Sequence, residues 1–316
     1  MGYIYRAFGF MLNLIYEFVA NYGISVILLT LLIKIIVLPL TLKQQKSMTK
    51  MQRVQPKLQE LQEKYKYDKE RASQETMKLY KEYGVNPMGG CLPLLIQFPI
   101  LIAMYQVIQR PVEYVLGYSK EALKAAFKAH EISEKTAGAQ IELAKKLGEL
   151  NFDFFGLDLA ATPWDELKAF FAGTAGVIAL TALIIPILSC VTTFLTSKIT
   201  TMMNKDKSKE KKEEVKPQRV LSPDPKKDTT DNPGESMTKS MTYFMPLMTL
   251  WLTFTFPAAL GLYWTVSNVL SLVQTIVLNG YYNKKLEREL EEQDKIREAK
   301  IQEKMKKYNM KKKKRS

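Results

Sequence analysis

The sequence predicts an all-α, polytopic membrane protein with five transmembrane helices and a cytoplasmic helical hairpin. Apolar stretches of bilayer-spanning length alternate with stretches that are dense in lysine and glutamate. Of the 316 residues, 47% are hydrophobic and 25% are charged, and the formal net charge is +14. Because the apolar and charged residues are segregated, we interpret the charged stretches as loops between spans and not as parts of one soluble domain.

Residues 1–20 are predicted to form an amphipathic helix in the membrane interface, and residues 21–43 the first span. In the amphipathic helix, apolar side chains recur every three or four positions. The stretch 22–42 is apolar except for Lys34 and is long enough to cross hydrocarbon about 30 Å thick, which takes about 20 residues. The apolar positions of the amphipathic helix are Phe8, Met11, Leu12, Ile15 and Phe18.

Lys34 is the most conspicuous residue of the first span because it lies near its centre. On insertion scales a lysine there costs on the order of 2.5–3.5 kcal/mol. A charge kept at such a position is therefore a functional-site hypothesis. The alternative is a lysine that extends its four-carbon stem to the headgroup region.

Residues 44–88 predict two charged helices joined by a turn at Tyr67 and Asp68. Each helix carries an apolar stripe, so we expect an antiparallel hairpin; the alternative is a linker of two solvated helices. Gly84 and Pro87 end the second helix. The stripes are Met48, Met51, Val54, Leu58, Leu61 and Tyr65 in the first helix, and Ala72, Met77, Leu79, Tyr80 and Tyr83 in the second.

The other four spans are predicted at 91–110, 173–197, 241–257 and 259–280. Prolines inside spans, such as Pro99, are tolerated because neighbouring helices satisfy the freed backbone groups. Between the spans lie an extracytoplasmic region at 111–171 and a charged flexible loop at 200–240, and a basic tail follows at 281–316. Aromatic residues are frequent in 151–164, which suits a membrane interface.

The charges of the loops predict the orientation in the membrane. Segments 43–90 and 204–240 and the tail are net basic, whereas 111–171 is net acidic. The positive-inside rule then places the N-terminus outside and the three basic segments in the cytoplasm.

Signatures of soluble enzymes are missing from the sequence, which has no phosphate-binding loop, dinucleotide-binding glycine pattern or zinc-binding histidine pair. We expect no cofactor, no metal and no catalytic activity. The sharpest enzymatic hypothesis is a Ser–Lys dyad, with Lys34 as base and Ser267 as nucleophile. Span serines are also common as small packing residues.

Lys34 has a second interpretation as part of a polar wall inside the bilayer. Such a wall would lower the cost of moving a polar peptide segment part-way across lipid, where each unsatisfied backbone group costs several kcal/mol. The alternative is that these polar residues hold helices together. The candidates besides Lys34 are Thr30, Gln97, Trp264, Ser267 and Asn268, with Trp251 nearby in the fourth span.

Three stretches of the chain resemble the YidC family of membrane protein insertases, the YidC/Oxa/Alb group. The resemblance covers most of residues 20–283 and is most specific in NPMGGCLPLLIQFPI and FPAALGLYWTVSN. The stretches are NYGISVILLTLLIKIIVLPLTLKQQKSMTKMQRVQPKLQELQEKY, QETMKLYKEYGVNPMGGCLPLLIQFPILIAMY and MTKSMTYFMPLMTLWLTFTFPAALGLYWTVSNVLSLVQ.

The resemblance implies the short, five-span type of this family in a bacterial plasma (inner) membrane, with an open hydrophilic groove. It implies insertion of nascent membrane proteins into lipid, alone or with the Sec translocon, and contact of the basic tail with the ribosome; no DNA partner is expected. The groove charge of the family falls on Lys34, where arginine is usual; arginine keeps its proton in proteins, whereas a buried lysine can lose it. The other groove positions fall on Thr30, Gln97, Trp264 and Ser267.

A small-solute channel or transporter is the alternative function from a different class. It predicts a pore through the bilayer and solute flux in liposomes. The spans show no internal repeat, which argues against the commonest transporter plans.

Overall fold

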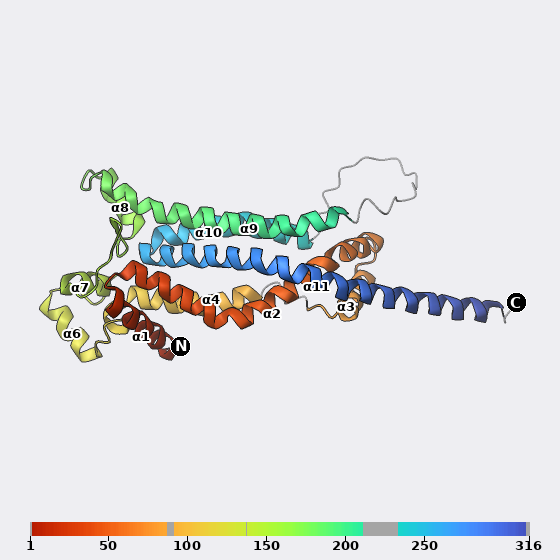
Figure 1. Cartoon of the computed structure of the whole chain (residues 1–316). Coiled ribbons are helices and arrows are strands. Elements are labelled where there is room, and N and C mark those ends of the chain that lie inside the picture. Colours follow the sequence, from red (N-terminus) through yellow and green to blue (C-terminus); the bar gives the residue numbers. More distant parts are fainter. Residues whose placement is uncertain (1, 87–91, 137, 211–232, 314–316) are drawn as a thin grey trace. The chain divides into compact units, whose positions relative to one another are not determined.

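The computed structural model describes residues 2–86, 92–136, 138–210 and 233–313 (Figure 1). The chain divides into two compact units. The first unit comprises Met1–Pro39 and Pro93–Val273, and the second Leu40–Leu92 and Gln274–Ser316. The elements are α1 (Gly2–Val19), α2 (Tyr22–Lys64), α3 (Lys69–Glu82), α4 (Leu92–Gln109), α5 (Pro111–Tyr114), α6 (Lys120–Ala129), α7 (Ala139–Leu147), β1 (Asp153–Phe154), β2 (Leu157–Asp158), α8 (Pro163–Phe171), the 3-10 helix η2 (Val177–Leu183), α9 (Ile184–Glu210), α10 (Pro233–Thr255) and α11 (Ala258–Lys313).

The predicted all-α membrane class is confirmed at the level of fold. Among the described residues, three helical stretches are long and apolar enough to cross a membrane, namely Tyr22–Lys64, Leu180–Ile199 and Ala258–Leu278. Two shorter apolar stretches lie in α4 and α10, at Leu95–Gln109 and Phe244–Thr255. In the same described part of the chain, the strands are the two-residue β1 and β2, which pair antiparallel.

The helices extend further than the predicted spans. The first span and the first hairpin helix are one continuous helix, α2, and the last span continues into the tail as α11. Both ends of the predicted flexible loop at 200–240 are helical, as the last residues of α9 and the first of α10; residues 211–232 lie outside the described part. The reason is local, because lysine, glutamate and glutamine are strong helix formers.

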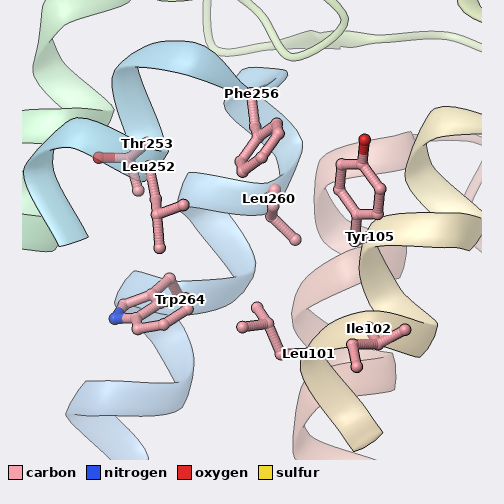
Figure 2. A pocket seen from close by; sticks show the side chains of 8 residues that line it. All are labelled: Leu101, Ile102, Tyr105, Leu252, Thr253, Phe256, Leu260 and Trp264. Atoms are coloured by element: carbon pink, nitrogen blue, oxygen red, sulfur yellow. The ribbon is translucent and has the colours of Figure 1, made fainter. Parts of the chain in front are cut away.

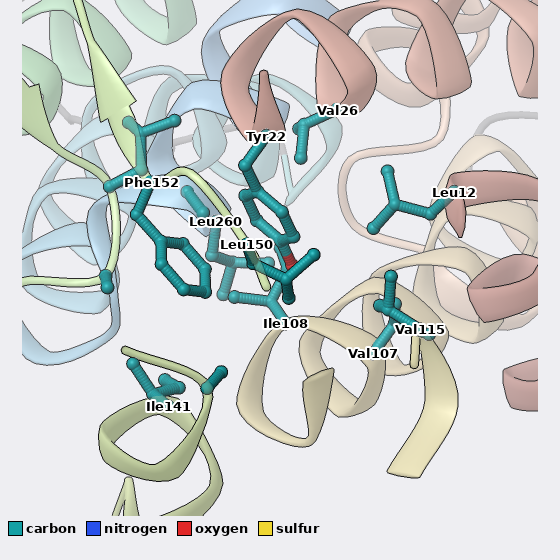
Figure 3. Packing of buried hydrophobic residues seen from close by; sticks show 14 of the residues in the cluster. Leu12, Tyr22, Val26, Val107, Ile108, Val115, Ile141, Leu150, Phe152 and Leu260 are labelled. Carbon is teal, nitrogen blue, oxygen red and sulfur yellow. The ribbon is translucent and has the colours of Figure 1, made fainter. Parts of the chain in front are cut away.

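The core of the first unit forms where α1, α2 and α4 meet the segment 111–171 (Figure 3). Tyr22, at the start of α2, is fully buried, and its ring centroid lies 4.7 Å from that of Phe152. Helix α1 turns Leu12 into this core, whereas Tyr3 and Phe18 are exposed. The amphipathic pattern of α1 therefore places one face against protein and leaves the other face free.

The segment 151–161 binds the first turns of two membrane helices. The first N–H groups of a helix have no partner within the helix. Here the Tyr22 amide donates to the carbonyl of Asn151 (3.0 Å), and the Ala258 and Ala259 amides donate to the carbonyls of Ala161 and Leu159 (both 2.9 Å). We call this segment the strap, because it holds the starts of α2 and α11.

The second unit contains a small core in which the end of α2 packs against α3. Asp68 caps α3 by accepting from the Arg71 amide at 3.0 Å. The Lys57 ammonium donates to the Tyr83 hydroxyl at 2.6 Å and lies 4.6 Å from the centroid of its ring. The buried residues draw on both predicted apolar stripes, with Val85 in addition: Val54, Leu58, Leu79, Tyr83 and Val85.

Candidate functional site

Polar side chains along α11 connect this helix to three other membrane helices within the first unit. They reach α2 through Ser271, α4 through Tyr263, and α9 through Thr265 and Asn268. In lipid a polar side chain has no water to bind, so such contacts decide where polar groups are tolerated.

The charged member of this set is Lys34 on α2. Its ammonium donates to the hydroxyl of Ser271 on α11 at 2.7 Å. The next two residues of α2, Ile35 and Ile36, are more than half exposed, whereas Ile33 is buried. Lys34 therefore lies between the exposed surface of α2 and the side of α2 that contacts α11. Its ammonium is directed at the Ser271 hydroxyl of α11.

A second polar contact joins α4 to α11. The Gln97 amide donates to the Tyr263 hydroxyl at 2.8 Å, and the same hydroxyl is hydrogen-bonded to Ser267. Tyr263 and Ser267 are both buried, and they lie one turn apart on α11. The contact satisfies three polar side chains that would otherwise be stranded in an apolar environment.

A third polar contact joins α9 to α11 where the two helices approach closely. The Ser189 and Thr265 hydroxyls are 2.7 Å apart, and Ser189 also donates to the carbonyl of Gly261 at 3.0 Å. One turn along, the Asn268 amide donates to the Thr193 hydroxyl at 2.7 Å. Small residues and interhelical hydroxyl bonds of this kind are the usual means of holding membrane helices together.

An apolar pocket of about 140 Å³ opens beside these contacts, between α4, α10 and α11 (Figure 2). The Thr253 hydroxyl donates to the carbonyl of Thr249 in its own helix at 2.8 Å. The Tyr105 hydroxyl and the Trp264 nitrogen point away from the other lining side chains (Figure 2), so the surface of the pocket is apolar. Its lining residues are Leu101, Ile102, Tyr105, Leu252, Thr253, Phe256, Leu260 and Trp264.

The predicted site residues fall into different surroundings. Lys34 meets the hydroxyl of Ser271 and not that of Ser267, the nucleophile of the hypothetical dyad. Thr30 is buried and donates to the Val26 carbonyl of its own helix at 2.6 Å. Trp264 lines the apolar pocket, while Asn268, from the same predicted face of α11, binds α9.

Several residues of these contacts were not predicted from the sequence, namely Ser271, Tyr263, Ser189, Thr193 and Thr265. Ser271 lies four residues after Ser267, so it was visible as the next polar position on that face of α11. Nothing in the sequence shows which of the two serines lies at the depth of Lys34. Tyr263 was inconspicuous because tyrosine is common in apolar spans near the interface.

These features define a polytopic helical membrane protein in which one lysine and several polar side chains of the spans face other helices. Among the described residues, no group of histidine, cysteine, aspartate and glutamate is placed to hold a metal ion. A sequence profile of the family described as "60Kd inner membrane protein" matches residues 14–285. The chain belongs to this family, that of the YidC membrane protein insertases.

Similar proteins carry the name of the family. "Membrane protein insertase YidC" of Clostridium perfringens is 33% identical over 273 residues, which cover 86% of this chain and 84% of that protein. "Membrane protein insertase YidC 2" of Listeria innocua is 32% identical over 276 residues, covering 86% of this chain and 69% of that protein. The protein of that family from Fusobacterium nucleatum is 50% identical over 113 residues, 34% of this chain; this match spans about half of that relative, 55% of its length.

Proposed function

We propose that this protein is a membrane protein insertase in which the polar contacts around Lys34 receive the polar flank of an incoming helix. The observation that carries the proposal is the ammonium of Lys34, placed in an apolar span and hydrogen-bonded to Ser271. A charge so placed is costly for insertion and folding, which favours a functional reason for it. No cofactor and no bond chemistry are needed.

The physical task of such a site is to lower a desolvation barrier. A polar peptide segment entering hydrocarbon loses its bonds to water, at several kcal/mol for each unsatisfied backbone group. Lys34, Gln97 and Ser267 would offer replacement hydrogen bonds, and the ammonium would attract acidic residues of the passenger. The apolar pocket beside Trp264 would accept the apolar side chains that follow, before the helix moves into lipid.

The proposed arrangement has five spans, α2, α4, α9, α10 and α11, with the N-terminus outside. The hairpin of α2 and α3 and the tail would then lie in the cytoplasm of a bacterium, where nascent membrane proteins arrive. The tail contains the run Lys311–Arg315, whose charges suit the phosphates of ribosomal RNA or the anionic headgroups of lipids. Work beside the Sec translocon belongs to the same proposal and rests on family membership.

The proposal is tested by insertion into proteoliposomes that contain only this protein. The substrate is a single-span protein with a short acidic translocated segment, and its twin carries an uncharged segment of equal length. We expect Lys34→Ala to reduce protease protection of the acidic substrate by about tenfold, the equivalent of 1.4 kcal/mol, and that of the twin much less. Lys43→Ala, which removes a lysine beyond the apolar stretch, is the matched control.

The outcome that contradicts the proposal is equal protection with and without the protein. Solute flux without protection would instead favour a channel. The Lys34 ammonium and the Ser271 hydroxyl are also close enough to act as the base and the nucleophile of a Ser–Lys dyad. The variant Lys34→Arg separates the groove from the dyad, because arginine keeps the positive charge but cannot act as a base.

A further inference from the structure

Three large aromatic side chains in and beside the strap are exposed, and packing within the chain does not account for them. Phe155 is 88% exposed, Phe171 78% and Trp164 49%. Single exposed apolar residues are ordinary on a protein surface. These three are not scattered, because they all lie in one short region, residues 151–171. This region contains an unfavourable turn and an aromatic helix face, and it adjoins the starts of the neighbouring spans.

Phe155 occupies a turn position that its side chain disfavours. It joins β1 to β2 together with Gly156, and the φ angles of the two residues are 54° and 81°. Two-residue hairpin turns with two positive φ angles favour Asn-Gly or Gly-Gly. A bulky residue with positive φ is rare, because its Cβ approaches the following carbonyl oxygen. The ring of Phe155 touches Phe154 at a centroid distance of 4.8 Å and otherwise projects outward, so the fold gains little from this unfavourable choice.

Helix α8 presents the other two aromatic residues on one face. Trp164 and Phe171 are seven residues apart, which is two helical turns. The ammonium of Lys168 lies 5.6 Å from the centroid of the Trp164 ring and pairs with Asp165 at 3.0 Å. An aromatic face edged by charged side chains is typical of helices that lie in a membrane interface.

The region that bears these residues lies at the starts of the three long apolar helical stretches. Gly23 of α2 lies directly against Phe154, since a Cβ there would be 2.6 Å from Cγ of that ring. The strap accepts hydrogen bonds from the first residues of α11. Helix α8 and strand β2 both pack against η2, which continues into α9. The exposed aromatic residues therefore lie at the level where α2, α9 and α11 enter the hydrocarbon.

We infer that Phe155, Trp164 and Phe171 insert into the interfacial layer of the bilayer at this level and anchor the strap to it. Phenylalanine and tryptophan side chains gain from burial there, and tryptophan keeps its N–H in contact with headgroups and water. The occupant of this surface is lipid, because apolar side chains near the starts of α2 and α9 are also exposed. They are Ile24 and Leu28 of α2 and Ile184, Ile187 and Leu188 of α9.

Tryptophan fluorescence tests the anchor directly in proteoliposomes. In the variant Trp251→Phe with Trp264→Phe, Trp164 is the one remaining tryptophan of the chain's three. We expect lipids brominated near the carbonyl end of the acyl chain to quench most of its emission, and lipids brominated near the methyl end to quench it less. Aqueous acrylamide should quench it weakly. Strong quenching by acrylamide, with no effect of brominated lipid, would overturn the inference.

A second measurement addresses Phe155 and has a matched control on α6. Phe155→Cys and Ala125→Cys are each made in a chain with Cys91→Ser and Cys190→Ser, and both positions are exposed. A nitroxide label at position 155 should relax more with dissolved oxygen, and a label at 125 more with a water-soluble nickel complex. Equal accessibility of both labels to the nickel complex contradicts the anchor. Neither readout depends on insertion, so the result stands apart from the proposed function.

Discussion

The partner of Lys34 determines whether its charge stays within the bilayer. A lysine with four methylenes can reach towards headgroups, and a fixed acceptor inside the span competes with that path. The hydroxyl of Ser271, 2.7 Å from the ammonium, is such an acceptor. Ser271 is thus a positioning residue for the charge in the proposed groove.

Replacement of Ser271 by alanine is expected to reduce Lys34-dependent insertion of the acidic substrate by about tenfold, because hydrogen bonds to charged groups contribute about 1.5–3 kcal/mol. Ser271→Thr, which keeps a hydroxyl, should restore most of the insertion. The control is Thr265→Ala on the same helix, whose hydroxyl binds Ser189 of α9 and not Lys34. A loss as large with Thr265→Ala as with Ser271→Ala would show that the effect concerns packing of α11 and not the charge.

Gly261 is expected to resist even a small side chain. A Cβ at this position would lie 2.6 Å from Cγ2 of Ile185 on α9, so Gly261→Ala must separate the helices. Overpacking of this kind costs about 1–3 kcal/mol. The control is Gly176→Ala, because a Cβ there meets nothing within 4 Å. Thermal unfolding of both variants in detergent checks the difference, and equal melting temperatures would contradict it.

The sequence identified candidates for the site better than it identified their partners. Lys34 stands out because a charge in an apolar span is rare, and Gln97 stands out because an uncharged polar side chain there has no water to bind. Pairing depends on the distance and rotation between helices, which periodicity does not encode. Ser267 and Ser271 share one face of α11, and only the packing of α2 against that face assigns Lys34 to Ser271.

At the scale of elements, periodicity predicted the faces of the helices, while α2 and α11 run on beyond the predicted ends of their spans. The stripes assigned to 44–88 supply Val54, Leu58, Leu79 and Tyr83 to the small core of the second unit. The boundary between span and hairpin was placed at the change from apolar to charged residues. The helix continues through that change, and through Pro39 and Pro56, because no glycine interrupts α2 after Gly23 and the lysine, glutamine and glutamate residues of its polar part are good helix formers.

The packing of α3 on α2 is expected to depend on Leu79. This side chain is 3% exposed, and truncation of a buried leucine to alanine costs about 2–5 kcal/mol. Leu79→Ala should therefore raise the rate of hydrogen exchange at the amides of α3. Met77→Ala is the control, since Met77 lies on the same helix and is 55% exposed. If both variants exchange at the wild-type rate, α3 does not owe its stability to this core.

A substitution in the turn of the β1–β2 hairpin should stabilise the protein more in detergent than in lipid nanodiscs. Phe155→Asn suits two positive φ angles, and relief of the left-handed backbone is worth about 1–2 kcal/mol. We expect a higher melting temperature in detergent. In lipid nanodiscs the gain should shrink, because the aromatic anchor is lost. A gain of the same size in both media would indicate that Phe155 does not contact lipid.

At the scale of the whole molecule, the strap supplies an argument about topology that composition alone does not. It binds the starts of α2 and α11, and η2 packs against β2 at the start of α9. Three membrane helices of the first unit therefore begin at the same level. After the chain has left this level along α2, it must return to the same level before α9 begins. After it has left again along α9, it must return before α11 begins. The shorter apolar helices α4 and α10 are the segments available for these returns.

Cysteine labelling in intact cells tests the proposed five-span topology. The reporters are Tyr67→Cys in the turn before α3, Ala125→Cys in α6 and Met310→Cys near the end of α11, each exposed in the structure and each made in a chain without Cys91 and Cys190. Because the segments around 67 and 310 are basic and 111–171 is acidic, the positive-inside rule places only position 125 outside. A membrane-impermeant maleimide should label Ala125→Cys in intact cells and the other two only after permeabilisation. If α4 did not cross the bilayer, positions 67 and 125 would lie on the same side of the membrane and would be labelled together. In that case the strap, which holds the starts of α2, α9 and α11 at one level, could not lie at a membrane surface.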